Sequence, residues 1–244
     1  MKAFGSTDRG AVRSENQDSF RFELQPGGEV LTAVLCDGMG GAQAGSVASA
    51  MGADTFMSHA ANSVDISSNA SDMRAILTEA VNYANVKVYD KSFADFSCMG
   101  MGTTLVAVLI SGKRAMVANV GDSRAYFVTK SKISQITHDH SLVAELVARG
   151  ELTEEEARTH PRKNVITRAI GVEASVRCDI FEPKLNPGDR LLLCSDGLTN
   201  MLSDEEILSA SNKNEDVEGW CSALIALALE RGATDNVTVF AVQR

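Results

Sequence analysis

The chain has 244 residues, of which 44% are hydrophobic, and it carries a formal net charge of −9 with a pI near 5.0. This charge argues against non-specific binding to nucleic acids or anionic membranes, because both need a basic surface. The N-terminal sequence MKAFGSTDRGAVRSENQD lacks the apolar stretch of a secretory signal. The sequence has no run of about 18 apolar residues, so it predicts no membrane span. Its five scattered cysteines lack a CxxC pair and favour reduced thiols in the cytoplasm.

Short runs of β-forming residues recur along the whole chain. The predicted strands are Lys2–Thr7, Ser19–Leu24, Val30–Cys36, Thr104–Ile110, Arg114–Val120, Ala125–Thr129, Lys132–Ile136, Val176–Glu182, Arg190–Ser195 and Val237–Val242. Several of them are joined by short turns such as Ser111-Gly112-Lys113. Such turns favour antiparallel hairpins over a strict alternation of strands and helices.

Longer stretches with helical patterns lie between these strands. The predicted helices are Gln43–Ala60, about Ser71–Phe93 and about Val217–Glu230. Two acidic clusters have the form of capping boxes, with Glu156 three residues after Thr153 and Glu206 three residues after Ser203. We interpret these clusters as helix starts rather than catalytic carboxylates. Many hairpin strands combined with a few long helices favour an α+β layered sandwich.

Four aspartates stand near the ends of predicted strands, each close to a glycine: Asp37, Asp122, Asp196 and Asp235. Any one of them fits ordinary turn chemistry. Four carboxylates brought together would repel one another and need compensation. A hard divalent cation such as Mg²⁺ or Mn²⁺ provides it, because these ions prefer oxygen ligands, and a neighbouring glycine lets a backbone carbonyl approach as well.

Other phosphate and metal chemistries fit the sequence less well. The stretch His138-Asp139-His140 lacks zinc-site spacing and is interpreted as a loop. The third glycine of a dinucleotide-binding GxGxxG falls on Gln43, and a GxxxxGK[ST] loop is absent from the sequence. Neither a CxxxxxR loop nor an Asp-x-Asp pair occurs. Metal-assisted hydrolysis without a protein nucleophile remains.

Seven motifs spread over nearly the whole chain share their order with one family. They are Thr7–Asp18, Cys36-Asp-Gly-Met-Gly-Gly41, Gly100-Met-Gly-Thr-Thr104, Gly121-Asp-Ser-Arg124, His160–Gly171, Cys194-Ser-Asp-Gly-Leu198 and Ala233-Thr-Asp-Asn-Val-Thr238. On these motifs the chain resembles the metal-dependent PP2C-type (PPM) serine/threonine protein phosphatases in their bacterial single-domain form. The resemblance implies a four-layer αββα sandwich, with two central antiparallel sheets flanked by helices. It also implies one domain over residues 1–244, with a flap at about residues 138–168.

The resemblance also implies a metal centre of Mn²⁺ or Mg²⁺, with two ions bound tightly. In this pattern Asp37 bridges the two ions and Gly38 contributes its backbone carbonyl. Asp196 and Asp235 complete one of the two metal sites. A water shared by the ions would then attack the phosphorus atom directly, in line with the leaving seryl or threonyl oxygen.

Further roles in the site follow from the same resemblance. Asp122, together with Asp196, would serve a third and weaker metal site, and Asp18 would order the groups around the ions. Arg13 would hold the substrate phosphate, which suits guanidinium geometry. Some relatives carry histidine where this chain has Met39, so the sequence leaves open which group protonates the leaving oxygen.

The expected substrates and partners are phosphorylated proteins, among them a serine/threonine kinase and the proteins it phosphorylates, with the enzyme acting as a cytoplasmic monomer. Two alternatives remain at this point. One is a dedicated phosphoserine phosphatase in a stress or sporulation switch, although such proteins usually carry additional sensor or membrane domains. The other is an inactive phosphoprotein-binding module, against which the intact set of aspartates argues.

Overall fold

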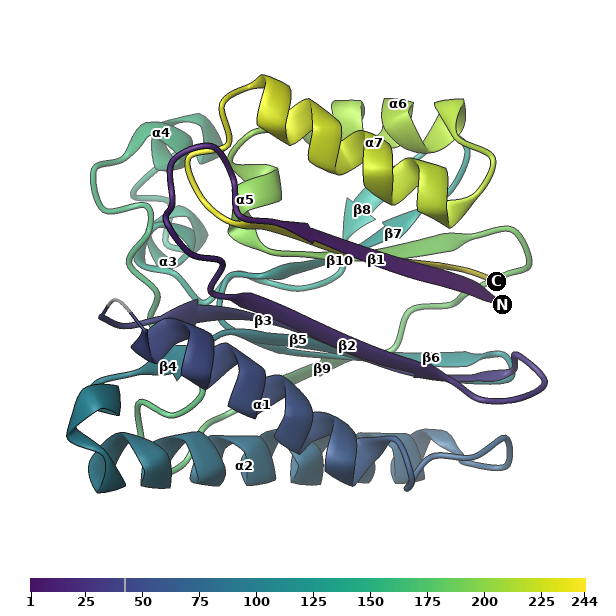
Figure 1. Cartoon of the computed structure of the whole chain (residues 1–244). Helices are drawn as coiled ribbons and strands as arrows, with labels where there is room; N and C mark the ends of the chain where they lie inside the picture. Colours follow the sequence, from purple (N-terminus) through teal and green to yellow (C-terminus); the bar gives the residue numbers. More distant parts are fainter. Residues whose placement is uncertain (42) are drawn as a thin grey trace.

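The computed structural model describes residues 1–41 and 43–244, and it contains two antiparallel sheets stacked face to face (Figure 1). The first sheet has the strand order β1 (Lys2–Asp8), β11 (Val237–Gln243), β10 (Arg190–Cys194), β7 (Arg124–Val128) and β8 (Ile133–Gln135). The second has the order β2 (Asp18–Leu24), β3 (Val30–Met39), β5 (Leu105–Ser111), β6 (Arg114–Val120) and β9 (Asp179–Phe181), with the short β4 (Gly102–Thr103) paired to β3.

Helices cover the outer face of each sheet (Figure 1). The second sheet is covered by α1 (Ala44–Ala60) and α2 (Ala70–Ala94), and the first by α6 (Asp204–Lys213) and α7 (Val217–Glu230). The remaining helical segments are η1 (Phe96–Cys98), α3 (Leu142–Ala148), α4 (Glu154–Thr159) and α5 (Asp196–Thr199). The predicted four-layer αββα sandwich is confirmed.

Three apolar clusters fill the three spaces between these four layers. Strand β3 shows how the sequence supplies two of them. Its residues Leu31 and Leu35 pack between the sheets. Val34 and Cys36 point to the opposite face and share a cluster with Phe56 of α1. Because both faces of β3 are covered, the strand is a continuous apolar run rather than an alternating one.

The predicted elements agree with the structure apart from their boundaries. Each predicted strand and each predicted long helix is present, and Thr153 and Ser203 each form the capping box expected of them. The prediction that β3 ends at Cys36 is wrong, because the strand continues to Met39. Pairing with β2 and β4 supplies hydrogen-bonding partners for these last residues, so Asp37 lies inside a strand rather than after one.

The longest helix, α2, has 25 residues. In the part of the chain that the structure describes, no helix is both long enough and apolar enough to cross a membrane.

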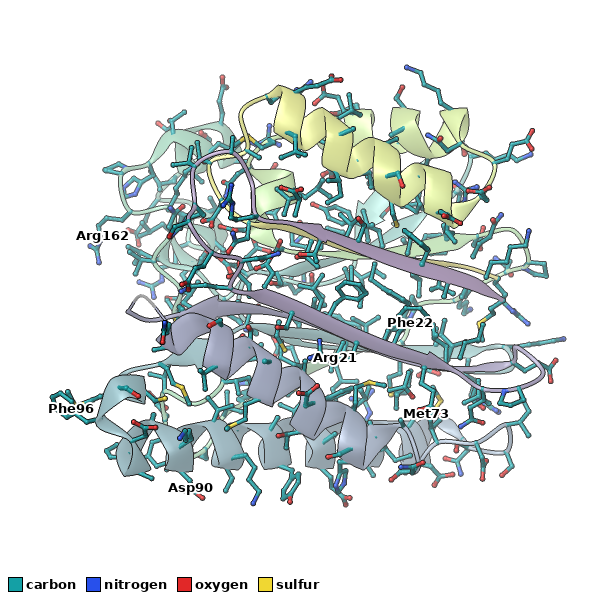
Figure 2. All side chains as sticks on the ribbon, viewed as in Figure 1. Arg21, Phe22, Met73, Asp90, Phe96 and Arg162 are labelled. Carbon is teal, nitrogen blue, oxygen red and sulfur yellow. The ribbon has the colours of Figure 1, made fainter. Side chains whose placement is uncertain are left out.

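We expect Phe56→Ala to lower the free energy of unfolding by about 3–5 kcal/mol, because it leaves a cavity under a fully buried ring. Phe96→Ala is the matched control, since Phe96 is 86% exposed and its side chain stands out from the molecule (Figure 2). Its effect should stay within about 0.5 kcal/mol. Urea unfolding of the two variants checks the assignment of the helix–sheet core, and similar losses in both would contradict it.

Candidate active site

One pocket of about 230 Å³ collects the four aspartates that the sequence analysis grouped together. Asp37 lies at the end of β3, and Asp122 lies in the turn between β6 and β7. Asp196 begins α5, and Asp235 lies in the turn before β11. In two stacked antiparallel sheets these chain segments meet at one end of the sandwich. Arg13 and Met39 also line the pocket.

The backbone of Asp37 is fixed by Thr104, which lies between β4 and β5. Its N–H donates to the hydroxyl of Thr104 at 2.9 Å, and its carbonyl accepts from the N–H of Thr104 at 2.8 Å. A Cβ atom on the next residue, Gly38, would lie 2.0 Å from the carbonyl oxygen of Gly45. The glycine is therefore required by the close approach of the first turn of α1.

Asp18 lies directly opposite Asp37 in the β2–β3 register and is buried. The hydroxyls of Ser195 and Thr238 donate to its Oδ2 atom at 2.8 and 2.7 Å. Its Oδ1 atom is buried and has no hydrogen-bond partner among the described residues. Asp18 thus joins the second sheet to Thr238 in β11 and to Ser195 directly after β10, next to Asp196, and it keeps one carboxylate oxygen without a partner in the described part of the chain.

Asp122 sits in a turn that is held from two sides. The N–H of Gly121 donates to Nδ1 of His140 at 3.0 Å, and the N–H of His140 donates to the carbonyl of Gly121 at 3.0 Å. Arg124 makes a bidentate ion pair with Asp139, with distances from 2.7 to 3.0 Å. The segment around His140 is a loop, as expected, but no sequence pattern indicated this structural role.

Asn236 is a second residue whose role the sequence analysis missed. This buried side chain holds the 9–17 loop through three hydrogen bonds. Its amide nitrogen donates to the carbonyls of Arg9 and Glu15, at 2.8 and 2.9 Å. Its side-chain oxygen accepts from the N–H of Gln17, at 2.8 Å. The same loop carries Arg13, whose Nη2 contacts Oδ2 of Asp235 at 2.7 Å. Arg13 remains about half exposed at the mouth of the pocket.

Burial and mutual repulsion make the charged state of these carboxylates unfavourable. The pKa of Asp37 is well above its usual value, first because of burial and then because of the charges of Asp18 and Asp196. Burial raises the pKa of Asp18 and of Asp122 to about 7. The pKa of Asp196 is also raised, by burial and by the charge of Asp235.

The donor set suits a hard divalent cation. The pocket offers carboxylates and backbone carbonyls, which such ions prefer, and the free Oδ1 atom of Asp18 is available to order groups around an ion. Within residues 1–41 and 43–244, no three His, Cys, Asp or Glu side chains already form a compact ligand cluster.

A family model described as protein phosphatase 2C matches residues 9–227. The chain belongs to the protein phosphatase 2C family. It is 38% identical over 245 residues to the "Serine/threonine phosphatase stp" of Listeria monocytogenes, covering all of this chain and 96% of the relative. It is 36% identical to "Protein phosphatase PhpP" of Streptococcus pneumoniae, covering 96% of this chain and 93% of that one.

Solved structures of similar proteins have the same fold. The crystal structure of the serine/threonine phosphatase Stp1 from Staphylococcus aureus superposes with a TM-score of 0.93 at 37% identity, covering 100% of this chain and 94% of that one. The catalytic domain of the phosphatase PstP, solved in complex with two manganese ions, gives a TM-score of 0.82 at 36% identity, covering 99% and 97% of the two chains. The chain is thus a protein serine/threonine phosphatase of a metal-dependent family.

The raised pKa values predict how the stability of this phosphatase depends on pH when a chelator removes cations. Asp18 and Asp122 have pKa values of about 7 when folded and about 3.9 when unfolded. The folded state therefore binds more protons between about pH 4 and pH 7, and stability falls as the pH rises through this range. We expect a lower Tm at about pH 8 than at about pH 5 with EDTA present.

Asp37→Asn should raise the Tm of the EDTA-treated protein at about pH 8 by about 2–4 °C, because it removes one repelling charge. Asp90→Asn, on the outer face of α2 (Figure 2), serves as the control and should leave the Tm unchanged. Thermal unfolding monitored by circular dichroism makes the comparison. A Tm that rises with pH in the wild-type protein would show that these carboxylates are not crowded.

Proposed function

We propose that this pocket hydrolyses phosphoserine and phosphothreonine in proteins with two divalent cations, Mn²⁺ or Mg²⁺, held by Asp37, the carbonyl of Gly38, Asp196 and Asp235. The observation that supports this assignment is the gathering of these carboxylates, with raised pKa values, in one pocket beside an exposed arginine. When bound, such a pair of ions lowers the pKa of water toward neutrality and offsets negative charge on phosphoryl oxygens.

Arg13 holds the phosphate in this proposal. Its guanidinium already reaches the pocket, where it pairs with Asp235 at 2.7 Å. Two parallel N–H donors fit phosphate oxygens as well as they fit a carboxylate. Because Asp235 is also a proposed cation ligand, Arg13 would exchange its carboxylate partner for the phosphate when both cation and substrate are present.

Hydrolysis breaks the phosphorus–oxygen bond to the seryl or threonyl side chain, and this oxygen must take up a proton. Met39 lines the pocket but cannot transfer a proton. His140 is buried, with Nδ1 accepting a hydrogen bond from Gly121, and burial lowers its pKa. Water in the open pocket is therefore the proposed acid.

Two further carboxylates support the site in different ways. Asp18 is a positioning residue, since its Oδ2 atom is fixed by two hydroxyls and its Oδ1 atom is free to orient groups around the cations. Asp122 with Asp196 would form a third and weaker cation site. Weak binding is expected there, because only two carboxylates, one of them shared with another cation site, would offset the free energy needed to dehydrate Mg²⁺.

Residues 138–168 form the proposed flap of a single phosphatase domain that spans residues 1–244. The two ends of this segment pair with each other, through the bridge between Ser141 and Ile166 and the bond from the N–H of Leu142 to the carbonyl of Val165. Between these ends, α3 and α4 contain no buried residue. Few buried contacts favour local opening, and the segment contributes Asn164 and Ile166 to the pocket.

A serine/threonine kinase and the proteins it phosphorylates are the proposed partners, with the phosphatase acting as a cytoplasmic monomer. A phosphatase dedicated to one stress or sporulation regulator is the alternative within the family. The pocket with its complete set of aspartates favours catalysis over binding alone.

The decisive experiment is hydrolysis of p-nitrophenyl phosphate and a phosphothreonine peptide with Mn²⁺, compared with EDTA. Activity with Mn²⁺ and its loss with EDTA are expected. Asp37→Ala, Asp196→Ala and Asp235→Ala should each retain less than about a tenth of the wild-type kcat, since about 1.4 kcal/mol of barrier corresponds to a factor of ten. Asp90→Ala, far from the pocket on α2, should keep full activity.

The outcome that would contradict this proposal is hydrolysis that persists in EDTA or in all three aspartate variants. Tight binding of the phosphopeptide without turnover would instead support the binding module.

Asp122→Ala tests the weaker cation site separately. It should leave the fold and the tight ions intact, slow peptide hydrolysis and raise the Mn²⁺ concentration needed for half-maximal activity, because only the weak site loses a ligand. The measurement is a Mn²⁺ titration of kcat for the wild type and the variant, with thermal melting as the control for folding. An unchanged titration curve would reduce Asp122 to a turn residue.

A further inference from the structure

A second hollow of about 250 Å³ lies beside the phosphate pocket and shares two of its walls. Met39 and Ile166 line both spaces. The other apolar residues of the second hollow are Ala169, Val172 and Val176. A depression whose lining residues are half apolar and half polar is thus continuous with the site where the phosphorylated side chain reacts.

The backbone around this hollow is held in a fixed position. Thr103 in β4 and Ile170 exchange two hydrogen bonds, with N···O distances of 3.0 and 2.8 Å, which hold the 166–172 segment against the end of β3. A Cβ atom on Gly102 would lie 2.6 Å from Cε of Met39 and 2.9 Å from Cγ2 of Val172. Gly102 therefore leaves the space that the side chains of Met39 and Val172 occupy.

The hollow presents apolar surface to solvent, and both of its arginines, Arg168 and Arg177, contact the carboxylate of Asp179. Val172 is 52% exposed, which is high for a valine placed beside a pocket. Arg168 is already paired with Asp179 at 3.1 Å, and the rim residues Glu173 and Arg177 carry opposite charges. Such a surface favours an apolar occupant over an acidic or basic one.

The size and position of the hollow indicate what this occupant is. Pockets for drug-sized ligands usually have about 300–1,000 Å³, and this one is smaller, with room for a side chain. Consecutive Cα atoms in a peptide are about 3.8 Å apart. A residue next to the phosphorylated serine or threonine is thus one short step from the phosphate pocket, and the hollow shares the wall of Met39 and Ile166 with that pocket.

We propose that this hollow is a substrate subsite that binds an apolar side chain adjacent to the phosphorylated residue of the protein substrate. The proposal rests on the phosphatase function assigned to the neighbouring pocket. It gives a role to Met39, which takes no part in proton transfer: its side chain is a wall shared by the phosphate pocket and the specificity subsite.

Phosphothreonine peptides that differ only in the residues next to phosphothreonine test this subsite. One peptide has Ala on both sides, and two others carry Leu either before or after the phosphothreonine. We expect Leu at one of the two positions to raise the wild-type kcat/KM about fivefold over the Ala peptide, a smaller gain than a closed pocket gives because the hollow is open.

Val172→Asp and Val172→Lys introduce opposite charges at the rim, and both should remove the preference for Leu. Hydrolysis of the Ala peptide should stay within about twofold of wild type, because Val172 does not touch the phosphate pocket. Val86→Asp is the matched control, since Val86 is an exposed valine on α2 (44%) and its replacement should leave the preference intact.

Equal kcat/KM values for the three peptides with the wild-type enzyme, or a preference that survives both Val172 variants, would overturn the subsite. Failure of the phosphatase function itself would be seen as no hydrolysis of any peptide with Mn²⁺. In that case, fluorescence anisotropy of the same labelled peptides measures their Kd values directly. Tighter binding of a Leu peptide that both Val172 variants abolish would support the subsite, and equal Kd values would overturn it.

Discussion

The repulsion between carboxylates at one end of the sandwich is the constraint to which the rest of the site responds. Asp37, Asp122, Asp196 and Asp235 line one pocket, and Asp18 lies beneath it. Without a compensating cation, burial and mutual charge raise the pKa of Asp37 and Asp196. The rest of the fold therefore has to supply the free energy that holds these carboxylates together, because their burial and mutual repulsion destabilise the folded state.

Hydrogen bonds with uncharged groups hold much of the site in position. Hydroxyls of Ser195 and Thr238 fix Asp18, and Asn236 fixes the loop that carries Arg13. The turn of Asp122 is held through its neighbour Gly121 by His140. Neutral partners fix positions without supplying the positive charge that would otherwise compete with a divalent cation for the carboxylates.

The two-sheet architecture determines what can surround the phosphate. Strand ends from both sheets supply the carboxylates, whereas the 164–177 segment supplies one wall of the pocket and most of the neighbouring hollow. Catalysis and recognition of the flanking residue are thus assigned to different parts of the chain. Substitutions at exposed positions such as Val172 can change which substrates fit while the carboxylates stay in place.

The secondary-structure elements and the residue types of the site could be predicted from the sequence. Local patterns set the strands and the long helices, and α7 spans the predicted residues Val217–Glu230. Four aspartates near strand ends, each close to a glycine, suggested a shared cation site, and the resemblance to PP2C-type phosphatases implied a role for each of them.

The contacts between distant residues could not be predicted and are seen only in the folded chain. Ser195 and Asp18 are 177 positions apart, and the structural roles of Asn236 and His140 depend on loops that the sequence does not bring together. The continuation of β3 through Asp37 depends on partner strands β2 and β4. Local propensity is encoded in neighbouring residues, whereas register, burial and the hollow beside Met39 arise only when all four layers pack.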